Sequence, residues 1–434
     1  MSPIIVVLSL QHCLPLPSYT HSHSNRLPIN PAHYNTFTMY SKAISGAVLG
    51  LSGLVSAYPS SSLGAPVAAS TGGAGQNVTS DQFPAPFPNV AKDSDAQKQI
   101  ERAALGTLPS GNAAPPTVSE DSLISLGLIA FNELFEVAFF TELISNITTS
   151  KLGYGHIDDQ DEVLRVLGIV QAQEELHFLN ANGAFNAFTG DSIQPCKYDF
   201  PVDTFEDAIA LASKFTDVVL STLPDIQTVF AQRNDTGLIR GVGSVIGQEG
   251  EQNGFFHQIL GQVPNQLPFL TGGARDFAFN AILQNFVVPD SCPSIDLLIA
   301  SKNGKGVGLR TIDTLTVDTD ANEFSIDKDI NAEFSAVTTN VGLGDSFVAQ
   351  TNSGMYLTYI NQQNAPFSVK IEEMTGEAGP LKFTANFPGE SMDLNGLTIA
   401  ALTRSDFTGK QMSPDDVATD ALFGPALIEV NQKI

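Results

Sequence analysis

Two short motifs in this chain combine a carboxylate with a second polar residue at helical spacing. The first has the sequence Glu-Glu-Leu-His from Glu174 to His177, and the second has Glu-Gly-Glu-Gln from Glu249 to Gln252. An acid and a histidine three residues apart leave one face of a helix together and can ligate a metal ion. The second motif has Gln252 where the first has His177, and an amide oxygen is a poorer ligand than imidazole for iron or manganese. The pair predicts metal chemistry in which at least one metal position is incomplete.

Four apolar segments with helical periodicity position these residues, at about 119–147, 159–182, 204–231 and 237–260. Ser119 and Asp121 can cap the first, Gly183 can end the second, and Thr204 can cap the third. Shorter helices are expected at 96–105 and 274–286. The fourth segment is rich in glycine, so we expect close backbone packing around it. The core-facing stripes carry Glu133, Glu136, Glu174, His177, Glu249 and Gln252, and the central acid of the third segment is Asp217. These seven are the candidate site residues.

Acids on apolar helix faces need a partner, because a buried unpaired carboxylate is costly unless it is paired, protonated or bound to metal. Acids at one depth on several helices would converge on a single point. In a four-helix bundle this arrangement is typical of a dinuclear carboxylate site. The alternative is a polar core without metal, in which Gln252 bonds Glu249 or His177, and His177 pairs with Glu133 or Glu174.

The chain changes character after Cys292. Short β-branched or alternating segments at 311–317, 334–339, 346–351, 355–360, 367–371, 381–387 and 397–402 are separated by turn residues. This pattern predicts an antiparallel β-sandwich. The fold class is therefore α+β, with a helical bundle over 118–290 and a β-rich domain over 293–434. The β-rich domain shows no catalytic constellation and could serve as a scaffold, a lid or an interaction surface.

The N-terminal region has the pattern of a secretory signal at 39–57, with a lysine, an apolar run and small residues up to Ala57. Residues 1–38 are a doubtful extension, and the start of translation, at Met1 or at Met39, is left open. Residues 58–117 form a low-complexity linker. In an oxidising compartment the pair Cys196 and Cys292 predicts a disulfide. Sequons at Asn77, Asn146 and Asn234 predict glycosylation.

The composition of the chain limits the classes of partner that it could bind. The formal charge is -25, from 46 acids against 21 bases, which argues against nucleic acid or an anionic membrane surface. No segment after the signal is predicted to span a membrane. We expect a secreted protein of the extracellular space or cell wall, with an extracellular partner for the β-rich domain. The sequence does not predict the oligomeric state.

The stretch from Asn132 to Phe140, the Glu174 to His177 tetrad and the Glu249 helix resemble the ferritin-like superfamily over about residues 118–290. With the signal, the cysteine pair and the β region, the chain more closely resembles secreted fungal ferritin-like proteins of the late sexual development and stress-response type. The resemblance implies metal ligation from all four helices. It makes Glu133, Glu174, His177 and Glu249 ligands, Glu136 an additional ligand, Asp217 a short replacement for the usual Glu, and Gln252 a replacement for a second His.

Two functions follow from that resemblance. The first is a secreted protein of fungal development or stress response with a degenerate di-metal site that holds little or no metal. The alternative is a dinuclear iron or manganese enzyme, an oxidase or a catalase-like one, in which carboxylates bridge the metals. The cofactor is accordingly iron or manganese, as two ions or one, or none. Whether the protein is an enzyme is left open at this point.

Overall fold

The computed structural model describes residues 82–111, 116–299, 308–337, 354–375 and 381–434. These residues belong to one compact unit that spans 77–434. The expected extension at 1–38, the signal at 39–57, Asn77 and the expected strand at 346–351 lie outside the described residues. Within them, the mixed helix and sheet composition predicted from the sequence is confirmed.

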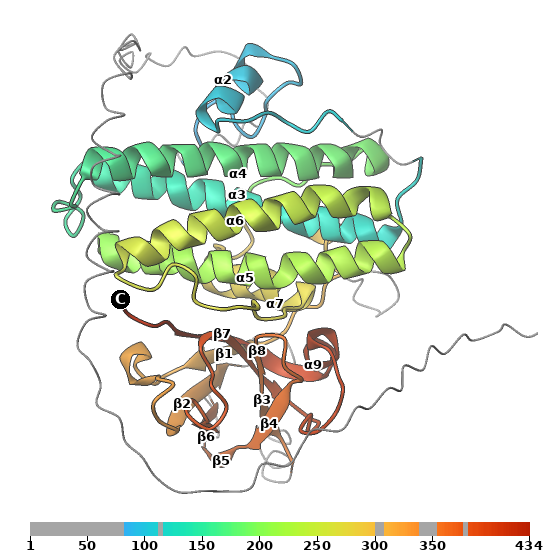
Figure 1. Cartoon of the computed structure of the whole chain (residues 1–434). Coiled ribbons are helices and arrows are strands. Elements are labelled where there is room, and N and C mark those ends of the chain that lie inside the picture. The colour runs from blue at the N-terminus through green and yellow to red at the C-terminus, as the bar shows by residue number, and fades with distance from the viewer. Residues whose placement is uncertain (1–81, 112–115, 300–307, 338–353, 376–380) are drawn as a thin grey trace, which may run out of the picture. The chain divides into compact units, whose positions relative to one another are not determined.

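Seven α-helices and three 3-10 helices form in the described part of the chain. Four of the α-helices are long and run side by side (Figure 1). The α-helices are α2 (Asp95–Ala103), α3 (Glu120–Thr148), α4 (Gln160–Thr189), α5 (Phe205–Gln232), α6 (Ile239–Ile259), α7 (Arg275–Asn285) and α9 (Pro414–Asp420). The 3-10 helices are η1 (Thr236–Leu238), η2 (Ile295–Leu297) and η3 (Ala321–Glu323).

Helix caps explain several of these boundaries. Ser119 accepts a hydrogen bond from the Ser122 backbone and starts α3, and Thr204 does the same for Asp207 at α5, as predicted. The predicted end of α4 at Gly183 is wrong. The helix continues because Phe185 is buried in the core, and it ends at Gly190, whose φ of 80° suits glycine.

The expectation of close packing around the glycines of α6 is also wrong for most of them. A Cβ atom would meet nothing within 4 Å at Gly241, Gly247 or Gly250. Only Gly243 has a tight neighbour, the Gln227 side-chain nitrogen at 2.9 Å. The helix is therefore stabilised by its buried face, where Glu249 and Phe256 are fully buried. The glycines with free space around them lower its stability through the loss of backbone entropy on folding.

Eight strands form two antiparallel four-stranded sheets in the described residues, in the orders β1-β2-β6-β5 and β4-β3-β7-β8. One hydrophobic core contains residues of both sheets, and Tyr359 meets Phe387 across it at 5.8 Å. The strands are β1 (Thr314–Val317), β2 (Ile330–Val337), β3 (Tyr356–Asn361), β4 (Phe367–Lys370), β5 (Glu372–Thr375), β6 (Leu381–Phe387), β7 (Gly396–Thr403) and β8 (Ala421–Val430).

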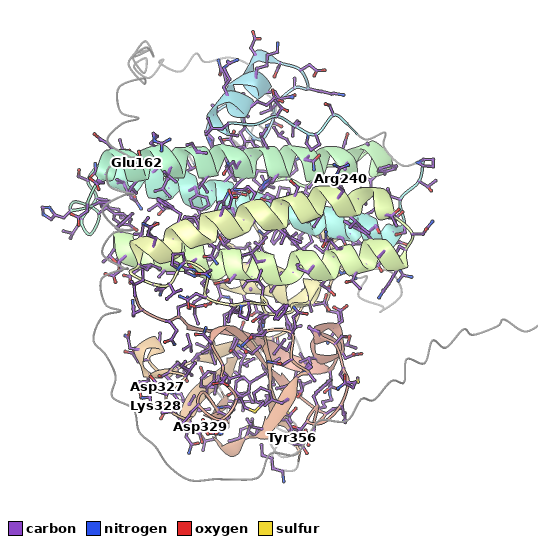
Figure 2. All side chains as sticks on the ribbon, in the orientation of Figure 1. Glu162, Arg240, Asp327, Lys328, Asp329 and Tyr356 are labelled. Carbon is purple, nitrogen blue, oxygen red and sulfur yellow. A yellow bond between two sulfur atoms is a disulfide. The ribbon has the colours of Figure 1, made fainter. Side chains whose placement is uncertain are left out.

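A further apolar cluster joins the helices to the second sheet. Val218 of α5 and Phe277 of α7 share it with Ile399 of β7 and Val417 of α9. Charged residues lie mostly outside these cores. Figure 2 labels examples on the surface, among them Glu162 on α4. Against this background, fully buried carboxylates between the long helices need a specific explanation.

Candidate metal centre

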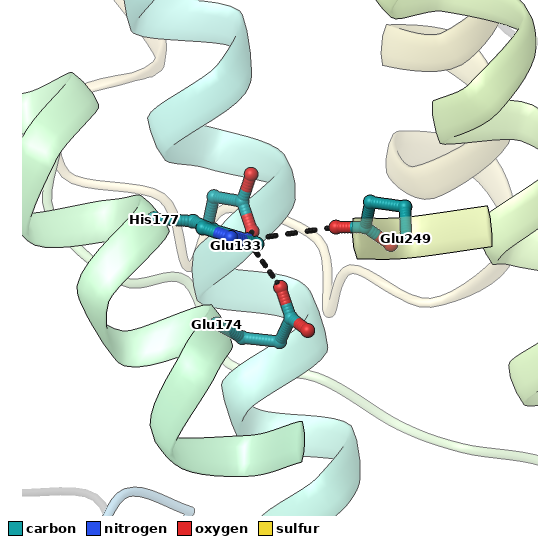
Figure 3. A group of neighbouring side chains, drawn as sticks. All are labelled: Glu133, Glu174, His177 and Glu249. Atoms are coloured by element: carbon teal, nitrogen blue, oxygen red, sulfur yellow. Dashed lines mark hydrogen bonds and ion pairs between the residues drawn. The ribbon is translucent and has the colours of Figure 1, made fainter. Parts of the chain in front are cut away.

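Four side chains from three helices converge in the middle of the long helices (Figure 3). Glu133 comes from α3, Glu174 and His177 from α4, and Glu249 from α6. One ligand atom from each lies within 4.8 Å of all the others. We call these four residues the core cluster. The glutamates are 0–1% exposed, and the His177 side chain is 14% exposed.

The Nδ1 atom of His177 lies at the centre of the core cluster. It is 2.8 Å from Glu174 Oε2, 3.5 Å from Glu249 Oε1 and 3.6 Å from Glu133 Oε2. Only the contact with Glu174 is a hydrogen bond. Three buried oxygens, Glu133 Oε2 and both of Glu249, have no hydrogen-bond partner.

Helix α3 supplies a nearly continuous apolar environment for this cluster. By length and composition it could cross a membrane, but 94% of its most apolar window is buried in the structure, as is typical of a core helix. Phe135, Phe139 and Phe140 pack edge to face with Phe215 of α5 at 5.0–5.9 Å. This aromatic packing fixes α3 against α5.

Burial controls the protonation of the core cluster. It raises the pKa of Glu133 and Glu136 well above the usual range, and that of Glu249 to about 7 with the Glu174 charge contributing. For Glu174, burial is outweighed by the charge and hydrogen bond of His177, which hold its pKa below the usual value. The carboxylates in turn raise the pKa of His177 well above its usual value, against the effect of burial. These pKa shifts favour the charged forms of His177 and Glu174 and the neutral forms of Glu133 and Glu136.

Gln252 takes part in a network of glutamines beside the core cluster. Its Nε2 donates to Glu174 Oε1 at 2.5 Å and to Gln173 Oε1 at 3.3 Å. Gln248 Nε2 donates to the same oxygen of Gln173, whose amide nitrogen donates to the Ala104 carbonyl. The network thus connects α6 through α4 to the end of α2. At the position where the resemblance predicts a second histidine, Gln252 instead donates a hydrogen bond to Glu174.

The two remaining predicted ligands are not in the core cluster. Glu136 lies close enough to feel the charges of Glu249 and Glu174, but its Oε1 accepts from Asn132 at 2.7 Å. Asp217 of α5 lies outside the core cluster, and its Oδ1 accepts a hydrogen bond from Asn253 Nδ2 at 2.9 Å. The structure therefore brings four of the seven predicted residues together, places Glu136 and Gln252 beside them, and places Asp217 elsewhere.

The predicted disulfide between Cys196 and Cys292 is confirmed, with the two Cα atoms 4.2 Å apart. It connects the segment after α4 to the segment after α7. Of the two sequons in the described residues, Asn234 is exposed in the turn between α5 and η1, whereas Asn146 is half-buried in the last turn of α3. Asn234 is thus the more accessible acceptor for a glycan.

No family model matches this chain, and no curated protein matches it significantly. The functional argument therefore depends on the geometry of the core cluster. Its donor set fits a divalent transition metal, because carboxylate oxygens and an imidazole nitrogen bind iron and manganese.

Proposed function

We propose that this chain is a ferritin-like protein whose helical core binds one iron or manganese ion. The ligands are Glu133, Glu174 and Glu249, together with Nδ1 of His177. The observation that carries the proposal is the convergence of these atoms within 4.8 Å while three buried carboxylate oxygens lack hydrogen bonds. Native proteins rarely leave buried polar groups unsatisfied without a functional reason. A cation would satisfy all three.

The surroundings favour one ion over two. The Gln252 amide nitrogen, which carries hydrogens, is directed at Glu174 Oε1, so in this orientation Gln252 acts as a hydrogen-bond donor to that carboxylate. Asp217, the expected ligand from the third helix, is bonded to Asn253. A second ion would need both positions. This arrangement makes the dinuclear enzyme the weaker alternative.

The space beside the core cluster also bears on catalysis. The cavity that touches Glu133 has a volume of about 10 Å³, which is about the size needed for one water molecule. Organic substrates do not fit there. Bound iron or manganese would supply one-electron redox chemistry. The role we propose is therefore metal binding, without turnover of an organic substrate.

The cellular setting belongs to the same proposal. A disulfide is typical of secreted proteins, and the net charge of -25 suits an extracellular protein that does not bind nucleic acid. We place this ferritin-like protein outside a fungal cell or in its wall, in development or the stress response, with the β sheets facing an extracellular partner.

The test is the metal content of protein purified from a secretory host and loaded with manganese or iron. The wild type should hold a single ion per chain, and His177→Ala should lose it. His156→Ala is the matched control, because His156 is exposed in the α3–α4 connection. Metal content that is the same in both variants would contradict the proposed site.

A further inference from the structure

A second cavity lies between α5, α6, the loop at 264–270 and the end of β8. Its volume is about 150 Å³, and it opens to solvent beside the exposed Asn265. Its lining includes seven polar side chains, and three leucines with Pro264 form an apolar part of it. The polar residues are Asp217, Asn253, His257, Asn265, Gln266, Glu429 and Asn431. None of them belongs to the core cluster.

His257 presents a hydrogen-bond acceptor to this cavity. The residue is only 4% exposed. Its Nδ1 lies 3.2 Å from the carbonyl oxygen of Pro264, and a carbonyl can only accept, so Nδ1 carries the proton. The buried Nε2 is then an acceptor, and it has no hydrogen-bond partner.

The other free atoms in the cavity wall are acceptors as well. Both carboxylate oxygens of Glu429 are buried without a hydrogen bond. Asn431 donates through Nδ2 to Gln262, which leaves its buried Oδ1 without a partner. Asp217 already accepts from Asn253, whose own oxygen accepts from Ser213. The cavity therefore offers acceptors from three elements and calls for a ligand that carries several donors.

Charge favours a cationic ligand. Burial, with the Asp217 charge contributing, raises the pKa of Glu429 well above its usual value, against the opposite effect of Lys214. The Asp217 carboxyl is buried enough that its pKa is raised to about 7. The carboxyl groups of Asp217 and Glu429 lie near each other, and both resist ionisation. A cation between them would stabilise the ionised form of both.

A bare metal ion is the poorer candidate. Among the described residues, only the core cluster brings ligand atoms of three or more His, Cys, Asp or Glu residues within 4.8 Å. The acids and histidine of this cavity are more widely spaced, and Leu220, Leu267 and Leu270 form an apolar part of its wall. A cavity of about 150 Å³ holds a ligand of the size of benzene, about six heavy atoms.

We propose that this cavity binds a short aliphatic diamine. Its ammonium groups would donate to Asp217, Glu429 and Nε2 of His257, and its methylene chain would lie along the leucines. Each ammonium has three donors and no acceptor, which matches a wall of free acceptors. The inference is independent of the proposed metal site, because the two sites share no residue.

The test is isothermal titration calorimetry of the full chain with 1,4-diaminobutane, which has six heavy atoms. We expect saturable binding of one molecule per chain. Butane-1,4-diol has the same size without the charges and should not bind. Octane-1,8-diamine carries the charges on a chain too long for the cavity, and it should bind at least about tenfold more weakly.

Variants decide whether the binding uses this cavity. Glu429→Gln should weaken diamine binding by about tenfold or more, whereas Glu390→Gln, at an exposed acid in the connection between β6 and β7, should leave it unchanged. Asn431→Ala is a second variant that tests the cavity if Glu429→Gln fails to fold. An absence of saturable binding, equal binding of the diol, or wild-type affinity in both cavity variants would overturn the inference.

Discussion

Replacing Glu249 by Gln should stabilise the protein when no metal is bound. Glu249 is fully buried, neither of its oxygens has a hydrogen bond, and its pKa is raised to about 7 by burial and by the Glu174 charge. The folded protein therefore prefers the neutral acid. A glutamine keeps the shape of the side chain and removes the charge.

The magnitude follows from proton linkage. The pKa of Glu249 is higher in the folded protein than in the unfolded chain. The stability that the neutral acid allows is therefore fully present below about pH 4.5, is lost as the pH rises to about 7, and does not return at higher pH. A rise from the usual 4.5 to about 7 corresponds to about 3 kcal/mol at about pH 8 and about 1 kcal/mol at about pH 5. The lost contact with His177, at 3.5 Å, reduces the gain. We expect Glu249→Gln to add about 2 kcal/mol at pH 8 and little at pH 5.

The assay is thermal unfolding of chelator-treated protein at both pH values. Glu251→Gln is the matched control, since Glu251 is exposed two residues away on the same helix. The Tm of Glu249→Gln should rise by about 4 °C at pH 8, and metal binding should be lost. The reasoning would be refuted by destabilisation of equal size at both pH values, or by the same response in the control.

Three further predictions concern other parts of the molecule. Asp217→Asn should raise the free energy of unfolding by about 1–2 kcal/mol at pH 8 and by less at pH 5, because burial raises the Asp217 pKa to about 7. The partial exposure of the side chain limits this gain. Urea unfolding at both pH values checks the prediction. Gly247→Ala should raise the free energy of unfolding by about 1 kcal/mol, because a Cβ meets nothing within 4 Å there; an unchanged urea midpoint would contradict it. Replacing Cys196 and Cys292 together by Ser should cost about 2–4 kcal/mol, since the bridge closes a loop across 96 residues; a Tm equal to that of the oxidised wild type would contradict it.

Much of the helical part could be predicted because helix signals are local. The apolar periodicity gave the four long helices, and the caps at Ser119 and Thr204 fixed two of their starts. Periodicity also predicted the acids and the histidine of the core cluster, which come from three of those helices. The rotation of a helix about its axis does not follow, because it depends on packing between helices. For this reason Asp217 was expected in the core cluster but faces Asn253.

The β region was harder to predict. Gly424 and Pro425 suggest a turn, yet they lie inside β8, where its pairing with β7 is irregular. Helix α9 carries a local signal in the sequence, a capping box between Ser413 and Asp416. The cavity beside Glu429 depends on long-range packing between α6 and β8, and no local pattern predicts it.

The central claim is a single metal ion held by the core cluster. The most direct measurement is an anomalous difference map from crystals of the manganese-loaded protein, recorded above the absorption edge of the metal. We predict one peak, within bonding distance of His177 Nδ1 and of carboxylate oxygens of Glu133, Glu174 and Glu249. Two peaks about 3.5–4 Å apart, or no peak between these residues, would contradict the claim.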